Sequence, residues 1–252
     1  MLVDNKFIYL SLPRCASTAF HYSCILSELD VQTYTNQWIP LNDNVDFKSI
    51  DKSNLMNHIY HAHESIIDLQ SKFGTDYPVI AVKRNRHERF YSLYKHLLFD
   101  LKRSGYHKIY NVFSKLTLDE LFFFTKNDLV NKKQRWNAIS EYLIELKLID
   151  TKIDNMGWEK HIFGYAVNMI DILLTPVSFW TNNDSNIIWF DFEKMNELEN
   201  WVSTKVNKSF KLESANSSKH IECIITLDTE FINKYNNIYD YYDLPKSIKT
   251  LI

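Results

Sequence analysis

The chain has 252 residues, a formal net charge of −2, and a composition that is 45% hydrophobic and 15% aromatic. This content of apolar and aromatic residues excludes an intrinsically disordered protein, and the length is enough for one sizeable hydrophobic core. The nearly balanced charge excludes a general attraction to nucleic acid or to an anionic membrane surface, so an anion site would need a local cluster of basic residues.

Apolar patterns and turn residues divide the chain into alternating strands and helices. The clearest strand is residues 77–83 (YPVIAVK), and the clearest helical face follows it, with apolar residues from Phe90 to Leu101. In chain order, the predicted elements are strand 7–11, helix 16–29, strand 57–63, helix 64–73 ending at Gly74, strand 77–83, helices 87–102, 118–124 and 135–148, strand 186–192, helix 193–206 and a Tyr-rich helix 228–242.

Strands separated by helices, without hairpin signals between them, are typical of a parallel sheet covered by helices. The sequence contains no internal repeat and no low-complexity linker that would mark a domain boundary. We therefore predict a single α/β domain over residues 1–252, with a mostly parallel central sheet flanked by helices. In such a sheet, ligands bind beyond the carboxyl ends of the strands.

Residues 7–26 (FIYLSLPRCASTAFHYSCIL) predict a strand, a tight turn that begins at Pro13, and a helix. This arrangement directs several backbone N–H groups and the positive end of the helix dipole at one point, which favours phosphate or sulfate. Arg14 would add a fixed positive charge, and Ser17 and Thr18 would add hydroxyl donors. The alternative interpretation is an ordinary strand–helix junction without a ligand.

A second candidate anion site begins at Arg84, which ends the strand 77–83. Ser92 lies eight residues further on, in the predicted helix, with Arg89 between them. A guanidinium group binds two phosphate oxygens with a pair of parallel hydrogen bonds, and the hydroxyl would donate to a third oxygen. Because Arg84 and the turn both follow strands, we expect them at one edge of the sheet, together with His61 and His63.

These stretches together resemble sulfotransferases that use 3′-phosphoadenosine-5′-phosphosulfate (PAPS). Residues 13–18 (PRCAST) match the first motif of that family, Pro-Lys/Arg-x-x-Ser/Thr-Thr, and Arg84, Arg89 and Ser92 match the anchors of the second, Arg-Asp-Pro-x-x-Arg-x-x-Ser. Residues 60–63 (YHAH) are similar to the Tyr-His-Gly-His region of heparan sulfate and uronyl 2-O-sulfotransferases. A weaker likeness to a late cofactor-contacting loop lies at residues 216–219 (NSSK).

The resemblance implies a P-loop-like three-layer α/β fold, PAPS as the sulfuryl donor, and a hydroxyl-bearing acceptor that is often a carbohydrate. It implies that His63 is the catalytic base, and that His61 orients His63 or contacts the acceptor. Arg14 and the backbone of the residues from Cys15 to Ala19 would stabilise the charge on the transferred sulfate. The residues implied in PAPS binding are Arg14, Cys15, Ala16, Ser17, Thr18, Ala19, Arg84, Ser92 and Lys219.

The sequence departs from the family pattern at four places. Ala16 stands where the family usually has Gly, and a residue with a Cβ is tolerated there only if the turn avoids positive φ. Asn85 and Arg86 replace Asp-Pro of the second motif, and Val177 stands where the family tends to have Gln. Arg14, in place of the usual Lys, stabilises charge but does not give up a proton near neutral pH.

Two other functions remain open on the sequence alone. A P-loop kinase or phosphotransferase would have Gly-Lys-Ser/Thr in the turn and a magnesium-binding Asp at a strand end; the turn lacks Gly-Lys, although Asp191 could serve as the acid. The other alternative is a degenerate protein that keeps the nucleotide-binding cleft but has lost turnover. We expect no metal site, because no acidic or cysteine ligand lies near His61 and His63 with zinc-like spacing.

The three cysteines, Cys15, Cys24 and Cys223, are widely spaced and odd in number. They favour reduced thiols in a cytosolic protein rather than a disulfide framework. No basic segment precedes an apolar run at the amino end, and charges interrupt every apolar stretch. The sequence therefore predicts a soluble cytoplasmic enzyme that binds neither membrane nor nucleic acid.

Overall fold

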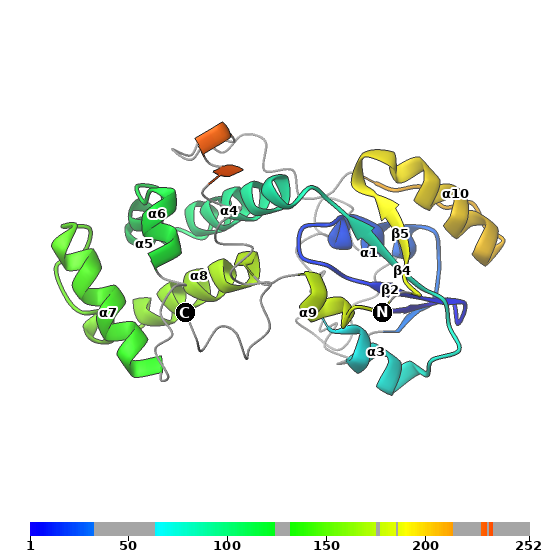
Figure 1. Cartoon of the computed structure of the whole chain (residues 1–252), viewed down its shortest axis with the longest axis horizontal. Coiled ribbons are helices and arrows are strands. Elements are labelled where there is room, and N and C mark those ends of the chain that lie inside the picture. Colours follow the sequence, from blue (N-terminus) through cyan, green and yellow to red (C-terminus); the bar gives the residue numbers. More distant parts are fainter. Residues whose placement is uncertain are drawn as a thin grey trace. The chain divides into compact units, whose positions relative to one another are not determined.

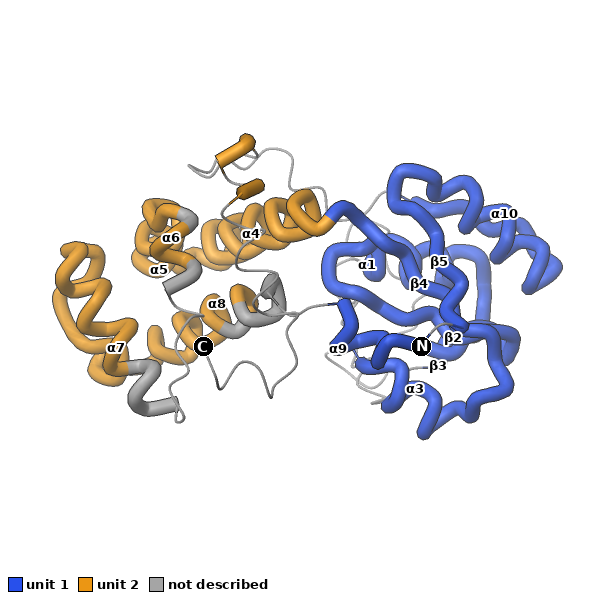
Figure 2. The backbone as a smooth tube through the Cα atoms, in the orientation of Figure 1, with its two compact units in different colours: residues 1–85, 177–217 blue, residues 86–176, 218–252 orange. Residues whose placement is uncertain are grey.

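The structure of the protein is a computed structural model. It describes residues 1–32, 64–123, 132–174, 177–184, 186–213, 228–230 and 232–233. The chain divides into two compact units, one formed by residues 1–85 and 177–217 and the other by residues 86–176 and 218–252 (Figure 2).

The first unit contains a five-stranded sheet. Its strands, in spatial order, are β3 (Val31–Gln32), β1 (Leu2–Val3), β2 (Phe7–Leu10), β4 (Val79–Lys83) and β5 (Ile188–Asp191). Strands β2, β4 and β5 are parallel to one another, whereas β1 is antiparallel to both of its neighbours. The fold is therefore α/β as predicted, but the sheet is mixed. The expectation of a mostly parallel sheet holds only for the three longer strands.

Helices lie on both faces of this sheet (Figure 1). On one face are α1 (Ser17–Leu26) and α10 (Met195–Val206), and on the other are α3 (Ile66–Phe73) and α9 (Val177–Thr181). The short helix η2 (Phe192–Lys194) links β5 to α10. The predicted stop of α3 at Gly74 is confirmed, because Gly74 ends the helix with φ 94°.

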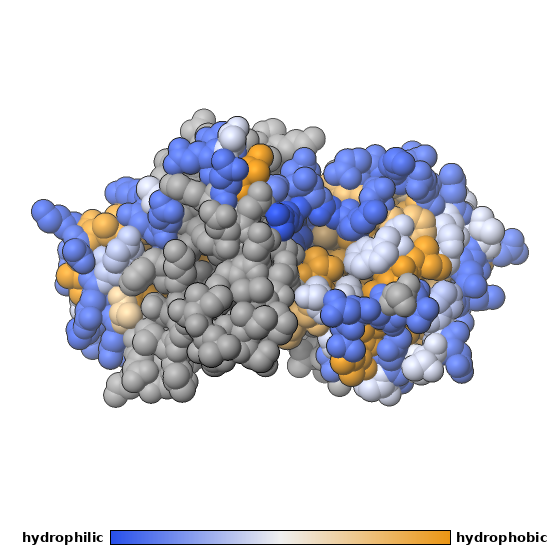
Figure 3. Space-filling view, viewed as in Figure 1, coloured by the Kyte–Doolittle hydropathy of each residue, from blue (hydrophilic) through white to orange (hydrophobic). Residues whose placement is uncertain are grey.

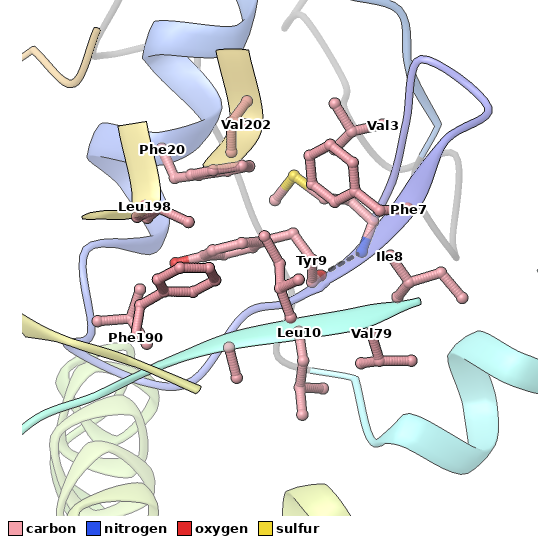
Figure 4. Close-up of a cluster of buried hydrophobic side chains, with 14 of the residues drawn as sticks. Val3, Phe7, Ile8, Tyr9, Leu10, Phe20, Val79, Phe190, Leu198 and Val202 are labelled. Carbon is pink, nitrogen blue, oxygen red and sulfur yellow. Dashed lines mark hydrogen bonds between the residues drawn. The ribbon is translucent and has the colours of Figure 1, made fainter. Parts of the chain in front are cut away.

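Alternating side chains of β2 give the first unit its core. Phe7 and Tyr9 point to the α1 and α10 face, where Phe7 contacts Trp201 edge-on at 5.1 Å between ring centroids and Tyr9 stacks on Phe20 at 3.9 Å. Ile8 points to the other side of the sheet (Figure 4). All four residues of β2 are buried. Because both faces are covered, this strand reads as a continuous apolar run.

The second unit is helical over its described residues. It comprises α4 (Arg86–Arg103), α5 (His107–Phe113), α6 (Leu118–Phe123), α7 (Lys132–Glu145), η1 (Ile153–Asn155) and α8 (Glu159–Leu174). The apolar face predicted for residues 87–102 is buried in its core, from Phe90 to Leu101. Tyr94 adds a buried hydrogen bond, donating to the carbonyl oxygen of Phe113 at 2.6 Å.

The expectation of one domain over residues 1–252 stays a prediction. The described residues form two apolar clusters, one in each unit. Whether two clusters unfold together or apart is a question of cooperativity, which their contacts alone do not answer.

Several other expectations concern parts of the chain at its surface or outside the described residues. Among the described helices, none combines the length and apolar character needed to cross a membrane. The face shown in Figure 3 is hydrophilic over α10 and carries hydrophobic patches near α3. The predicted strand 57–63 lies outside the described residues, as does most of the predicted helix 228–242.

Candidate anion-binding site

The turn between β2 and α1 is held in place from its core side. The backbone N–H of Cys15 and the hydroxyl of Ser17 both donate to the carbonyl oxygen of Leu12, at 3.2 Å and 2.8 Å. The hydroxyl of Tyr9 donates to the carbonyl oxygen of Cys15 at 3.0 Å. Burial raises the pKa of Tyr9, so the phenol stays protonated and keeps its donor.

Residues of the turn alternate between buried and half-exposed. Cys15 and Ser17 are buried, whereas Arg14, Ala16 and Thr18 are half-buried. A hydroxyl has one hydrogen to donate, and that of Ser17 is directed at Leu12. In this conformation Ser17 can therefore offer an anion its backbone N–H, but not the hydroxyl donor that the sequence suggested.

The backbone of the turn is left-handed at two residues with a Cβ. Arg14 has φ 59° and Ala16 has φ 63°. For an L-residue this conformation costs roughly 1–2 kcal/mol, a cost that Gly avoids. From the sequence, Ala16 was expected to be tolerated only in a turn that avoids positive φ, whereas the structure has a positive φ at this residue. The turn therefore has a backbone conformation that suits Gly, and Arg14 and Ala16 are strained because they adopt it with a Cβ.

The amino end of α1 opens toward this turn. Its N-cap residue, Ala16, makes no side-chain hydrogen bond to the first helical turn. The first backbone N–H groups of a helix have no partner within the helix, and the helix dipole places partial positive charge there. The backbone of Ser17, Thr18 and Ala19 therefore suits the binding of a phosphate or sulfate, and Arg14 lies three residues before it in the chain.

Arg84 follows the strand next to this turn. In the parallel pairing of β2 with β4, Leu10 lies opposite Ala81, so Arg14 and Arg84 come four and three residues after a matched pair. Parallel strands end at the same edge of a sheet, which places the turn and Arg84 on neighbouring strands at the carboxyl edge. This agrees with the common edge that the sequence predicted for these two.

Two side chains at this edge, Phe192 and Lys83, were assigned to no site from the sequence, and Asp191 was named only as a possible magnesium ligand. The guanidinium carbon of Arg84 lies 4.4 Å from the ring centroid of Phe192. Beside it, Lys83 Nζ lies 3.1 Å from Asp191 Oδ1. Since Asp191 ends β5 and Phe192 follows it, these contacts depend on the register of β4 with β5, where Lys83 pairs with Asp191. No local sequence signal announces that register.

The remaining predicted site residues belong to the second unit or lie outside the described residues. Arg89, which is buried, and Ser92, which is half-buried, belong to α4 of the second unit. That they contact the same phosphate as Arg84 stays a prediction. His61, His63 and Lys219 lie outside the described residues. Within the described ranges, no cluster of three or more His, Cys, Asp or Glu side chains suits a metal ion.

Comparisons with known proteins add no relative. No protein-family model matches the chain, and no curated protein and no solved structure matches it either. The function must therefore be argued from the residues of the site.

Proposed function

We propose that this chain is a sulfotransferase that moves a sulfuryl group from PAPS to a hydroxyl of a carbohydrate acceptor. The observation that supports this most is the placement of two candidate anion-binding elements on neighbouring parallel strands: the turn with Arg14 after β2, and Arg84 after β4. Helices on both faces of those strands are what a P-loop-like three-layer fold requires.

The described residues fit a ligand with two separate anionic groups. The amino end of α1 and Arg14 suit the phosphosulfate, because backbone N–H groups and a guanidinium donate to several oxygens at once. Arg84 suits the 3′-phosphate, with Ser92 and Lys219 as its proposed partners. Bound PAPS would supply an activated sulfuryl group joined through a bridging oxygen to a good leaving group.

The proposal assigns a role in sulfuryl transfer to Arg14, His63 and His61. Arg14 keeps its positive charge at all relevant pH values and stabilises negative charge that grows during transfer, an effect worth several kcal/mol in comparable sites. His63 accepts the proton of the acceptor hydroxyl, since an imidazole has an ordinary pKa near neutral pH. His61 orients His63 or contacts the acceptor.

A kinase is less well supported by the same residues. The acid that could hold magnesium, Asp191, forms an ion pair with Lys83 at 3.1 Å. The turn at residues 13–18 (PRCAST) also lacks the consecutive Gly-Lys pair of a phosphate-binding kinase loop. A sulfotransferase requires neither a metal-binding Asp nor that Gly-Lys pair.

Ligand-dependent melting separates the candidate functions. A ligand present at 100 times its Kd stabilises a protein by about 2.7 kcal/mol. We expect adenosine 3′,5′-bisphosphate to raise the melting temperature and ATP with magnesium to leave it unchanged. The reverse result would support a kinase.

Turnover separates an enzyme from a degenerate binding protein. PAPS consumption against a panel of sugar and phenol acceptors should be measurable in the natural chain and abolished in His63→Ala, with bisphosphate binding retained. The control is His161→Ala, which removes an exposed histidine on α8 and should change nothing. Binding without consumption by the natural chain would indicate a protein that has lost turnover.

A further inference from the structure

Arg84 is stacked on an aromatic ring at the carboxyl edge of the sheet. Its guanidinium carbon lies 4.4 Å from the centroid of Phe192, which begins η2 directly after β5. The register that pairs Lys83 with Asp191 also brings the two following residues, Arg84 and Phe192, next to each other. The contact is thus built into the strand pairing of β4 and β5.

Stacking restricts how Arg84 presents its hydrogen bonds. A guanidinium is planar, and all of its N–H bonds lie in that plane. When one face rests on a ring, the group loses rotational freedom and its N–H bonds point outward around the rim. A phosphate bound at the rim then meets a pair of donors already oriented for two parallel hydrogen bonds.

The neighbouring ion pair has a complementary effect. Lys83 and Asp191 form the matched pair that directly precedes Arg84 and Phe192. Lys83 Nζ lies 3.1 Å from Asp191 Oδ1, with both side chains substantially exposed. An exposed pair adds little stability, but it compensates the negative charge of Asp191 locally.

We infer that Phe192 is a positioning residue: it fixes the plane of the Arg84 guanidinium for a second phosphate of the nucleotide, while Lys83 compensates the negative charge of Asp191 beside this contact. This inference rests on the proposed function and extends it. According to this inference, Phe192 and Lys83, which lie outside the family motifs, help the protein to distinguish a nucleotide with two phosphates from one with a single phosphate.

Nucleotide titrations by calorimetry test the role of Phe192. The ligands are adenosine 3′,5′-bisphosphate and adenosine 5′-phosphate, which differ only in the second phosphate. We expect Phe192→Leu to weaken the binding of the bisphosphate by roughly 3- to 30-fold, which is the range expected for the loss of a cation–π contact. The affinity for the monophosphate should not change. Phe192→Tyr keeps a ring face and should bind both ligands like the natural chain. Phe179→Leu, which removes an exposed aromatic ring on α9, is the matched control.

The outcomes distinguish the two levels of the proposal. If the natural chain prefers the bisphosphate but Phe192→Leu binds it equally well, the inference is wrong and the proposed function stands. An equal loss for both ligands, or the same loss in Phe192→Tyr, also overturns the positioning role. If the natural chain binds neither nucleotide, the proposed function fails and the inference fails with it.

A second pair of variants tests the arrangement without altering the ring. Lys83→Met should weaken bisphosphate binding, because the negative charge of Asp191 is then uncompensated and repels the phosphate. The double variant Lys83→Met with Asp191→Asn should recover the affinity, since that negative charge is removed as well. Persistent weakness in the double variant would show that Lys83 itself binds the ligand, contrary to the inference. Both side chains are exposed, so these variants should fold.

Discussion

The Tyr9 hydroxyl donates a 3.0 Å hydrogen bond to the carbonyl oxygen of Cys15, which links the buried sheet to the candidate anion-binding turn. Tyr9 is itself fixed by stacking on Phe20, with ring planes 6° from parallel. The turn therefore rests on the core of the first unit, and its shape should respond to a change made beneath it.

We expect Tyr9→Phe to lower both stability and nucleotide affinity. The variant keeps the ring but leaves the buried carbonyl of Cys15 without its donor, which costs about 1–3 kcal/mol. Urea unfolding measures the first effect, and titration with adenosine 3′,5′-bisphosphate measures the second. Tyr94→Phe is the control, because Tyr94 donates in the same way to Phe113 in the second unit. A similar loss of affinity in both variants would contradict a specific link between Tyr9 and the turn.

We expect Ala16→Gly to stabilise the protein by about 0.5–1 kcal/mol. The left-handed conformation at φ 63° costs Ala roughly 1–2 kcal/mol, and Gly avoids this cost. Gly also gives the unfolded chain more conformational entropy, which offsets part of the stabilisation. Ala19→Gly, within the first turn of α1, should instead lose about 0.5–1 kcal/mol. Urea midpoints of the two variants should therefore move in opposite directions. Destabilisation by both changes would show that the turn does not hold Ala16 at positive φ.

The sequence predicted those features of the site that local patterns carry. The apolar run of β4 and the apolar face of α4 are such patterns, and both elements were predicted close to their observed positions. The neighbouring placement of the turn and Arg84 followed from the general rule for parallel strands. Each of these inferences needed only a short window of residues.

Features that arise from tertiary contacts were not predictable in this way. Strands β1 and β3 have two residues each and exist through their pairing, so they leave no periodic pattern. The positive φ of Ala16 goes with hydrogen bonds from Tyr9 and Ser17 that hold the turn. The stacking of Arg84 on Phe192 joins residues more than 100 positions apart through the register of two strands.

Helix α8 shows tertiary packing overriding a weak local signal. It spans Glu159–Leu174 and contains Gly164, a poor helix former, and no helix was predicted over most of that range. Phe163, Ala166, Val167 and Ile170 are nevertheless buried in the core of the second unit. Burial of that face stabilises the helix where its intrinsic propensity does not.

We expect the protein to lose stability as the pH falls below neutral, in part because of His21. Burial, with the nearby amino group of Met1 acting in the same direction, lowers the pKa of His21 from 6.5 to about 3. Above pH 6.5 the imidazole is neutral in both states and contributes nothing. Below it the unfolded chain takes up a proton that the folded chain does not, which costs about 2 kcal/mol at pH 5.

The variant His21→Gln isolates this contribution. It cannot titrate, so its loss of stability between pH 7 and pH 5 should be smaller than that of the natural chain by about 2 kcal/mol. Comparing each protein with itself at two pH values removes any constant cost of the substitution. Urea unfolding at both pH values gives the difference. An identical pH dependence in the two proteins would mean that His21 is not a buried neutral histidine.

The single-domain prediction implies that the two apolar clusters unfold together. Phe20 lies in the cluster of the first unit and Phe163 in that of the second, and both are fully buried. Replacing either by Leu should cost on the order of 1 kcal/mol or more. In one cooperative domain, Phe20→Leu and Phe163→Leu would each shift the same single calorimetric transition, and fluorescence and circular dichroism would report one midpoint. Two transitions, of which each variant moves only one, would instead show that the helical residues between β4 and β5 form a domain inserted into the sheet-containing one.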